Sequence, residues 1–420
     1  MFKYQLIFHN AKPPTLSALS MFYIIPIIAL LFITYTISLT SHLSTYPADT
    51  QNNEIIKAKA TPKTISIFGS KPPVATQGKI EPVDMGTIDP LVPPFNITKE
   101  ERIEWFRRKC PELKLFKANN SRQKFHDQVL EFFNKDCSAH YFMVWLSPAQ
   151  SFGPREFSTI DSLFKADPNG CLIILSTSLN SRQGHMILKP LLHRGFKVLA
   201  VIPDLHFLLK NTPAKAWLDE MNSGTRDPGT IPLSNNLSNL IRLAILYKYG
   251  GIYLDVDFII LKDFREFRNA IGAQSMNTVT GKWNRLNGAV MIFDADHPIL
   301  HDFLEEFATT FDGSKWGHNG PYLISRVTRS VEDMPGRNFT ISPPKTFYPI
   351  DWIKIVRLFK KPETESELKR VEEMLLEFST SSYAIHLWNH RTRELIIEEG
   401  SVMERLISDH CIVCQQTHDQ

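Results

Sequence analysis

Short apolar runs alternate along the chain with amphipathic segments and with clusters of turn-forming residues. Tyr141–Leu146, Leu172–Ser176 and Phe196–Ile202 have the pattern of parallel strands that are buried on both faces. Ser181–His193, between the last two, has the pattern of a helix, and Gly195 follows at the place where a helix stop is expected. This order predicts an α/β fold with a mostly parallel central sheet flanked by helices.

The segment Leu240–Leu261 holds the clearest chemical signal. An apolar helical run ends at Gly-Gly, a short β-rich run follows, and Asp255 and Asp257 come directly before the next apolar run. Ligands of parallel sheets bind at the carboxyl ends of the strands. Two carboxylates at such a point are costly to bury without a positive partner, and a divalent metal with a phosphate-bearing ligand supplies one. The alternative is a solvated turn after the strand.

The predicted helix before these aspartates carries a polar stripe. Asn235, Asn239 and Arg242 recur at helical spacing. The positions opposite this stripe are apolar: Leu237, Leu240, Ile241 and Ala244. Arg242 therefore either orients a nearby carboxylate or a sugar hydroxyl, or is an ordinary solvated surface residue.

The N-terminal pattern predicts a membrane anchor. Residues 19–39 are uncharged and mostly apolar, Lys3 and Lys12 precede them, and the length suits a bilayer helix. We expect a cytosolic tail (1–18), a transmembrane signal anchor (19–39) and a stem (40–99) rich in Pro, Thr and Ser. A cleaved signal peptide is the alternative, although its apolar region is usually shorter.

Composition narrows the class of protein. The chain has 420 residues, a net charge of +3 and 43% hydrophobic residues, which excludes a mainly disordered protein and leaves room for one large domain or two small ones. Lys and Arg are scattered and offset by Asp and Glu. We therefore expect no nucleic-acid partner.

Sequons and cysteines are consistent with a lumenal domain. N-glycosylation sequons begin at Asn96, Asn119, Asn236 and Asn338, and the position of Asn236 at the start of a helix argues against its modification. The five cysteines, which leave one unpaired if disulfides form, are Cys110, Cys137, Cys171, Cys411 and Cys414. The Cys-Ile-Val-Cys motif is expected to form a structural bridge rather than half of a zinc site or a redox pair, because no second Cys/His pair stands at zinc spacing. The pairing of the cysteines stays open.

Several motifs, taken together, resemble the α-1,4-glycosyltransferase family, which carries a DxD sugar-binding motif and includes lactosylceramide α-1,4-galactosyltransferases; the chain resembles a plant-type member. They are Ser238–Asp257, Leu286–Val290, Trp316–Pro321, Phe347–Ile350 and His386–Asn389. The resemblance covers Cys137 to Ile407 and implies a lumenal glycosyltransferase domain over 100–410, with a DxD region at about 140–275 and a C-terminal region at about 285–410.

The family resemblance implies a GT-A fold, a UDP-sugar donor, Mn²⁺ (or Mg²⁺) and transfer with retention. Asp255 and Asp257 would hold the metal on the donor diphosphate, where it neutralises the charge that develops on the leaving UDP. His386 matches the His near the end of the family pattern, and is interpreted as a third metal or diphosphate ligand. The alternative for His386 is an ordinary core histidine.

Further site residues follow from the same resemblance. Asn239 and Arg242 match positions where the family usually has Asp and Arg contacting the donor sugar, and the Asn puts donor identity in doubt. Asn287 is expected at a strand end, contacting donor or acceptor, with a plain turn as the alternative.

The loop Trp316–Pro321, with its Gly and Pro breakers, displays two polar side chains towards the same end. His318 is expected to contact the donor. The resemblance to retaining enzymes, in which a side-chain amide near this point lies beneath the anomeric carbon, implies that role for Asn319. It also implies a front-face mechanism in which the leaving diphosphate oxygen takes the acceptor proton. Trp145, at the end of the first strand, either stacks on uracil or fills the core.

These observations predict a single-pass type II Golgi membrane enzyme that transfers galactose or N-acetylglucosamine from a UDP-sugar to a glycan or glycolipid acceptor. A catalytically inactive, membrane-tethered protein that binds glycans or nucleotide sugars with the same fold is the alternative. A phosphatase of the haloacid dehalogenase type also uses Asp-x-Asp after a strand. Its motif stands early in the domain, which argues against it here.

Overall fold

The computed structural model describes residues 89–117, 122–332 and 334–414. The chain divides into two units, Met1–Glu81 and Pro82–Gln420, and the described residues belong to the second. No helix within these described ranges has the length and apolar character needed to cross a membrane. The predicted tail, the predicted anchor and the stem up to residue 88 lie outside the described residues.

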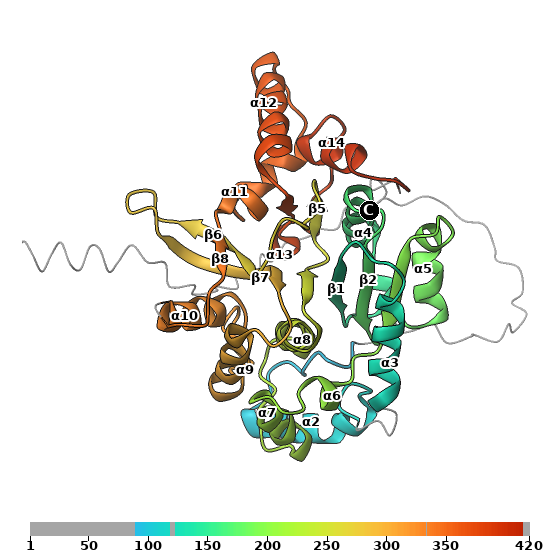
Figure 1. The fold of residues 1–420 in the computed structure, drawn as a ribbon, viewed down its shortest axis with the longest axis vertical. Coiled ribbons are helices and arrows are strands. Elements are labelled where there is room, and N and C mark those ends of the chain that lie inside the picture. Colours follow the sequence, from blue (N-terminus) through green and yellow to red (C-terminus); the bar gives the residue numbers. More distant parts are fainter. Residues whose placement is uncertain (1–88, 118–121, 333, 415–420) are drawn as a thin grey trace, which may run out of the picture. The chain divides into compact units, whose positions relative to one another are not determined.

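A seven-stranded mixed sheet forms the centre of the fold, in the order β3-β2-β1-β4-β7-β6-β8 (Figure 1). Its strands are β1 (His140–Trp145), β2 (Cys171–Ser176), β3 (Lys197–Val201), β4 (Gly251–Leu254), β6 (Ala270–Met276), β7 (Trp283–Phe293) and β8 (Thr340–Ser342). β7 runs antiparallel to its neighbours β4 and β6, and the remaining neighbours are parallel. The mostly parallel α/β sheet predicted from the sequence is therefore confirmed.

Helices cover both faces of this sheet. The helices of the described residues are α2 (Lys99–Lys109), α3 (Arg122–Phe133), α4 (Pro154–Ala166), α5 (Arg182–Leu192), α6 (Leu205–Leu208), α7 (Ala214–Ser223), α8 (Leu233–Tyr249), α9 (Pro298–Thr310), α10 (Pro321–Val331), α11 (Pro344–Phe347), α12 (Glu365–Ser381), α13 (Asn389–Thr392) and α14 (Val402–Asp409), with 3₁₀ turns η1 (Cys110–Glu112), η2 (Ala149–Ser151) and η3 (Ile355–Phe359). Of these, α12 and α14 pack in a separate apolar cluster away from the large sheet. The predicted helix Ser181–His193 corresponds to α5, with Ser181 as its N-cap and His193 as its C-cap.

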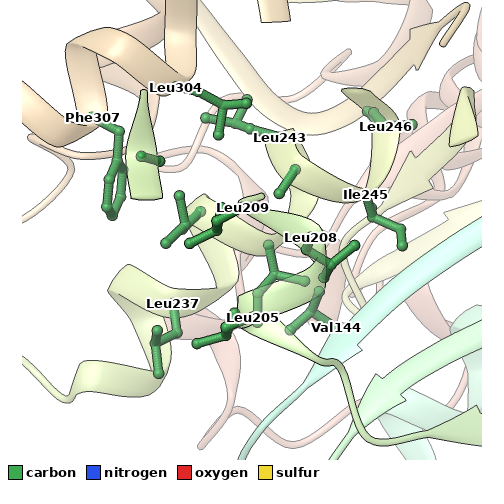
Figure 2. Packing of buried hydrophobic residues seen from close by; sticks show 14 of the residues in the cluster. Val144, Leu205, Leu208, Leu209, Leu237, Leu243, Ile245, Leu246, Leu304 and Phe307 are labelled. Carbon is green, nitrogen blue, oxygen red and sulfur yellow. The ribbon is translucent and has the colours of Figure 1, made fainter. Parts of the chain in front are cut away.

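The two faces of β1 belong to two different apolar clusters. Phe142 and Val144 pack with α6, α8 and α9, whereas Tyr141 and Met143 pack with α4 and α5. Figure 2 shows part of the first cluster, to which Val144 of β1 and side chains of α6, α8 and α9 contribute. Burial on both faces is why β1 and β2 read as continuous apolar runs rather than alternating ones.

Two glycines turn the chain from α8 into β4. Gly250 and Gly251 have φ values of 65° and 110°, in the region that favours glycine. A Cβ on Gly250 would lie 2.7 Å from the backbone nitrogen of Ala295, and one on Gly251 would lie 2.7 Å from the carbonyl oxygen of His140. The turn therefore requires glycine at both positions, and it delivers Asp255 to the carboxyl end of β4.

A second, two-stranded sheet joins the C-terminal region to the DxD segment. β5 (Phe258–Ile260) runs antiparallel to β9 (Ala384–His386), with Phe258 opposite His386. A third apolar cluster, built from η3, α12, α14 and residues of these two strands, supports it. This pairing carries His386 to the aspartates.

The cysteines form two disulfides, Cys137–Cys171 and Cys411–Cys414, and Cys110 is free and buried. The Cys-Ile-Val-Cys motif forms a structural bridge, as expected, and the structure supplies the pairing that the sequence left open: Cys411 bonds to Cys414. The buried carboxylate of Asp161 in α4 accepts hydrogen bonds from the backbone N–H groups of that motif. The motif is thereby fixed to α4.

Candidate functional site

Asp255, Asp257 and His386 lie together at the carboxyl end of β4. One ligand atom from each lies within 4.8 Å of the others. The two aspartates follow β4 directly, and His386 ends β9, which reaches the site through its pairing with β5. The structure thus brings together the three residues that the sequence predicts as metal ligands.

Asp255 is held by two side chains of the protein. Arg242 places Nη2 2.9 Å from its Oδ1, and the hydroxyl of Tyr253 donates to the same oxygen at 2.7 Å. Burial raises the pKa of the Asp255 carboxyl, and the charge of Arg242 opposes that effect. The ion pair therefore favours the ionised carboxylate, the form that binds a metal.

Arg242 is buried, so the interpretation of it as a solvated surface residue is wrong. Its Nη1 donates to the carbonyl oxygen of Gly288 at 2.7 Å, and its guanidinium lies 4.6 Å from the ring centroid of Tyr253. Burial is the largest single effect and lowers its pKa, but Asp255, Tyr253 and Tyr348 together raise it more, so the net pKa lies above the ordinary value. Arg242 is therefore a positive charge that is held in place beside the carboxylate of Asp255.

Asp257 is oriented by the segment that follows β9. The backbone N–H of Asn389 donates to its Oδ2 at 2.9 Å, and Nε2 of His386 lies 3.2 Å from its Oδ1. Trp388, between these two residues, has a φ of 53°, which is rare for a bulky side chain. This left-handed residue turns the chain so that the N–H of Asn389 faces the carboxylate.

His386 is buried among aromatic rings, with centroid distances of 4.1 Å to Trp388 and 4.7 Å to Phe258. Its Nδ1 has no hydrogen-bond partner among the described residues. An ordinary core histidine has its ring nitrogens satisfied. Two carboxylates and one imidazole with ligand atoms within 4.8 Å of one another fit a divalent metal such as Mn²⁺ or Mg²⁺.

Asn239 and Arg242 lie on the same side of α8, as the polar stripe predicts. The Asn239 side chain donates to the carbonyl oxygen of Asn235 at 3.1 Å. A Cβ on Gly320 would lie 2.7 Å from Oδ1 of Asn239. The loop Trp316–Pro321 therefore packs closely on the amide of Asn239, near Arg242.

Asn287 lies inside β7, so its expected place at a strand end or in a turn is wrong. It faces Gly272 where the pairing of β6 and β7 shifts register. Its Oδ1 accepts from the N–H of Ala289, whose carbonyl oxygen in turn accepts the N–H of Asp255. A bulge in a continuous strand, rather than a turn, therefore brings Asn287 close to the site.

The side chains of His318 and Asn319 form hydrogen bonds that fix the loop Trp316–Pro321. His318 Nε2 lies 2.8 Å from the carbonyl oxygen of Thr310. The buried Asn319 amide donates to Oδ1 of Asn236 and to the carbonyl oxygen of Asp312, and it accepts the N–H of Asp312. Because these contacts occupy both ends of the amide, this arrangement does not support the predicted role beneath the anomeric carbon and favours a structural one.

Trp145 is buried at the end of β1, and its Nε1 donates to the carbonyl oxygen of Pro148 at 3.3 Å. Its ring meets Phe152 edge-on. A cavity of about 270 Å³ at the carboxyl ends of β1 and β2 is lined by the residues just after Trp145, including Ser147 and Pro148, but not by Trp145 itself. This packing favours the core-filling alternative for Trp145.

Sequence reasoning missed the residues that orient the ligands. Tyr253 stands two residues before Asp255, and this spacing puts both on one side of a strand. Tyr348 donates to the carbonyl oxygen of Asn287. Asn389 contacts Asp257 through its backbone, and its side chain donates to the buried Glu156, whose pKa burial raises. Tyr348 and Asn389 lie in motifs that resemble the family, and this was the sequence feature that could have indicated a role for them.

In comparisons with known proteins, the chain matches two family profiles. Residues 292–418 match the α-1,4-glycosyltransferase conserved region, and residues 153–277 match the glycosyltransferase sugar-binding region containing the DXD motif. An uncharacterized protein of Arabidopsis thaliana is 32% identical over 69% of this chain and 44% of its own length. The lactosylceramide 4-alpha-galactosyltransferase of Gorilla gorilla gorilla is 33% identical over 54% of this chain and 68% of its own.

A human alpha-1,4-N-acetylglucosaminyltransferase is 30% identical over 50% of this chain and 58% of its own length. The chain therefore spans less than half of the Arabidopsis protein and about two thirds of the gorilla enzyme. The sugar-binding profile ends at residue 277, before β7, and the α-1,4-glycosyltransferase profile begins at residue 292, near the end of β7. The aspartates therefore fall in the sugar-binding profile and His386 in the other.

Proposed function

The chain belongs to the α-1,4-glycosyltransferase family, and we propose from that premise that it transfers a hexosyl residue from a UDP-sugar to a glycan or glycolipid acceptor. The observation that carries this proposal is the group of Asp255, Asp257 and His386 at the carboxyl end of β4. Ligands of parallel sheets bind at this edge, and a sugar diphosphate is the kind of anionic ligand that such a metal group accepts.

Asp255, Asp257 and His386 would hold the divalent ion, Mn²⁺ or Mg²⁺, which would neutralise negative charge on the donor diphosphate. The protein's own contribution is orientation. Arg242 and Tyr253 fix the first carboxylate, and the backbone of Asn389 fixes the second. These contacts keep both oxygens in place before a ligand arrives, which is how a preorganised site lowers the cost of reaction.

The donor would extend from the aspartates towards α8 and β7. Asn239, Arg242 and Asn287 lie along this path, and we propose them as the residues nearest the donor sugar within a GT-A type fold. Galactose and N-acetylglucosamine are both candidate donor sugars, because the relatives' names specify transferases of each. The nucleoside would lie towards the carboxyl end of β1, where the cavity beside Ser147 opens.

We propose transfer with retention, which the same names support. The relatives are named as α-transferases, and UDP-hexose donors are α-linked as well, so a transfer of this kind would keep the anomeric configuration. We propose a front-face transfer in which the leaving diphosphate oxygen takes the proton of the acceptor hydroxyl. Such a reaction depends on positioning and electrostatics more than on a protein nucleophile.

For the whole chain we propose a single-pass type II protein of the Golgi membrane. The apolar residues 19–39, the Lys residues before them and the sequons after them support this topology. The two disulfides suit an oxidising, lumenal compartment.

Donor hydrolysis tests the proposal. The purified domain from about residue 89 would be incubated with a panel of UDP-sugars in Mn²⁺ or in EDTA. We expect slow, metal-dependent release of UDP from one donor, and loss of that release in Asp255→Ala/Asp257→Ala. Asp409→Asn, an exposed substitution in α14, serves as the matched control. If the protein shows no hydrolysis of any donor and no metal-dependent binding of UDP, the result would instead support an inactive binding protein.

A further inference from the structure

The exposed aromatic rings of Trp316 and His390 lie next to the segment His386–Asn389, which contains the proposed metal ligand His386. Trp316 keeps 56% of its surface exposed, and its ring packs against that of His390 with 4.6 Å between the centroids. His390 is exposed as well. Trp145 and Trp388, in contrast, are largely packed and donate their indole N–H groups to backbone carbonyls. An exposed aromatic ring that is held in place offers an apolar face on which a ligand can pack.

The chain connects this ring pair directly to the proposed catalytic group. His390 follows Asn389, whose backbone N–H donates to Asp257 at 2.9 Å. Both residues belong to α13, which starts after the left-handed turn at Trp388. The His390 side of the pair is therefore fixed by the same contacts that orient the second metal ligand.

The other side of the pair is fixed by the loop that Trp316 begins. Asn319 ties this loop to Asn236 of α8, and His318 ties it to the end of α9. Arg326 of α10 donates to the carbonyl oxygen of His318 at 3.2 Å. A Trp held on such a loop offers a large rigid surface, and little conformational entropy is lost when it binds a ligand.

We propose that Trp316 and His390 form a platform that binds a hexose ring of the acceptor. One face of a pyranose ring presents C–H groups, which pack on an aromatic face, while the hydroxyls at its edge stay in water or meet polar groups. The donor diphosphate needs the charged group of Asp255 and Asp257. The platform consists of two rings without a carboxylate, and both side chains are exposed to solvent, where an acceptor chain must enter.

This assignment rests on the proposed function, because an acceptor site has meaning only beside a donor site. It adds a residue-level acceptor site to that function. It also accounts for His318 and Asn319, whose side chains are engaged within the protein: they position the Trp316 loop from behind.

The experiment compares Trp316→Ala, Trp316→Phe and the wild type, in protein loaded with Mn²⁺ and a hydrolysable UDP-sugar. Methyl and octyl glycosides of β-galactose, β-glucose, β-N-acetylglucosamine and β-lactose serve as acceptor probes. The quantity measured is the ratio of sugar transfer to acceptor-independent UDP release. We expect Trp316→Ala to lower this ratio roughly tenfold, as for loss of an aromatic contact residue, and Trp316→Phe to restore most of it.

Phe95→Ala is the matched control, because Phe95 is an aromatic side chain with 87% exposure before α2. Equal losses for methyl and octyl glycosides support contact with the sugar. A loss confined to octyl glycosides would overturn the proposal in favour of contact with a lipid tail. An unchanged ratio in Trp316→Ala would overturn it, as would wild-type protein that releases UDP but neither binds nor glycosylates any probe. Absence of UDP release itself would count against the proposed function instead.

Discussion

Asp257 and Asn389 stand 132 positions apart in the sequence, yet the backbone N–H of Asn389 donates to Oδ2 of Asp257 at 2.9 Å. The DxD motif and the C-terminal motif therefore form one structural unit. A backbone donor does not depend on the identity of its side chain. The geometry of this contact is instead set by the pairing of β5 with β9 and by the turn at Trp388.

Asp257→Asn removes the negative charge of this side chain but keeps its size and an oxygen that can accept the hydrogen bond. The amide oxygen still accepts the N–H of Asn389, so the protein is expected to fold with a melting temperature close to that of the wild type. Loss of the negative charge is expected to weaken Mn²⁺ binding roughly tenfold or more, or about 1.4 kcal/mol. Titration with Mn²⁺ followed by electron paramagnetic resonance measures this, with Asp409→Asn as the control. Equal affinity in Asp257→Asn would remove this carboxylate from the ligand set.

Arg242→Leu is expected to destabilise the fold. The substitution leaves Asp255, whose side chain is 26% exposed, without its positive partner, and removes the donor to the carbonyl oxygen of Gly288. Breaking a largely buried ion pair costs about 3 kcal/mol, less where water reaches one partner. Urea unfolding measures the loss. Arg242→Lys keeps the charge but not the forked geometry, so an intermediate loss is expected. Full stability of both variants would contradict this role.

Asn236 and Asn319 are expected to be coupled. Each side chain is buried, and the amide of Asn319 donates to Oδ1 of Asn236 at 2.8 Å. Each single substitution to Ala is expected to lower the free energy of unfolding by about 1–3 kcal/mol, because it leaves the other group without its partner. The double variant should lose less than the sum of the two. Strict additivity in a double-mutant cycle would show that the bond contributes nothing.

The sequons are expected to differ in occupancy. Asn96 and Asn338 are exposed, whereas Asn236 is buried and bonded to Asn319. A glycan on Asn236 would prevent this packing. In chain produced through a eukaryotic secretory pathway, enzymatic deglycosylation should convert Asn96 and Asn338, but not Asn236, to Asp, as read by peptide mass spectrometry. A glycan found on Asn236 in folded protein would contradict the structure there. Asn119 lies outside the described residues.

Asp161→Ala is expected to loosen the C-terminal bridge. The carboxylate of Asp161 accepts from the N–H groups of Ile412, Val413 and Cys414. Its removal leaves these donors unpaired, at a cost of about 1–3 kcal/mol. Hydrogen exchange at 411–414 should speed up even with the Cys411–Cys414 disulfide intact. If exchange instead changes only in Cys411→Ser/Cys414→Ser, the disulfide alone holds the segment.

Local pattern was enough to predict much of the fold. The predicted strand Leu172–Ser176 differs from β2 by one residue, and the predicted helix Ser181–His193 coincides with α5 and its two caps. Strands that are buried on both faces and helices with cap residues are specified by residues that are consecutive in the chain. A single sequence is therefore enough to predict them. The Gly-Gly turn before Asp255 was readable for the same reason, since only glycine suits its φ values.

The sequence by itself determined the chemistry of the site: two aspartates at the end of a strand, an arginine on the preceding helix, and a histidine in a motif of its own. Only the tertiary structure decided how these residues are used. Pairing of β5 with β9 set His386 beside Asp257, and a register shift inside β7 moved Asn287 away from its expected strand end. Packing of the Trp316 loop on α8 bound the amide of Asn319 within the protein, and left the ring of Trp316 exposed beside His390. Such contacts join segments that are distant in the chain, and their geometry depends on packing and hydrogen bonding across the whole domain, so no local pattern encodes them.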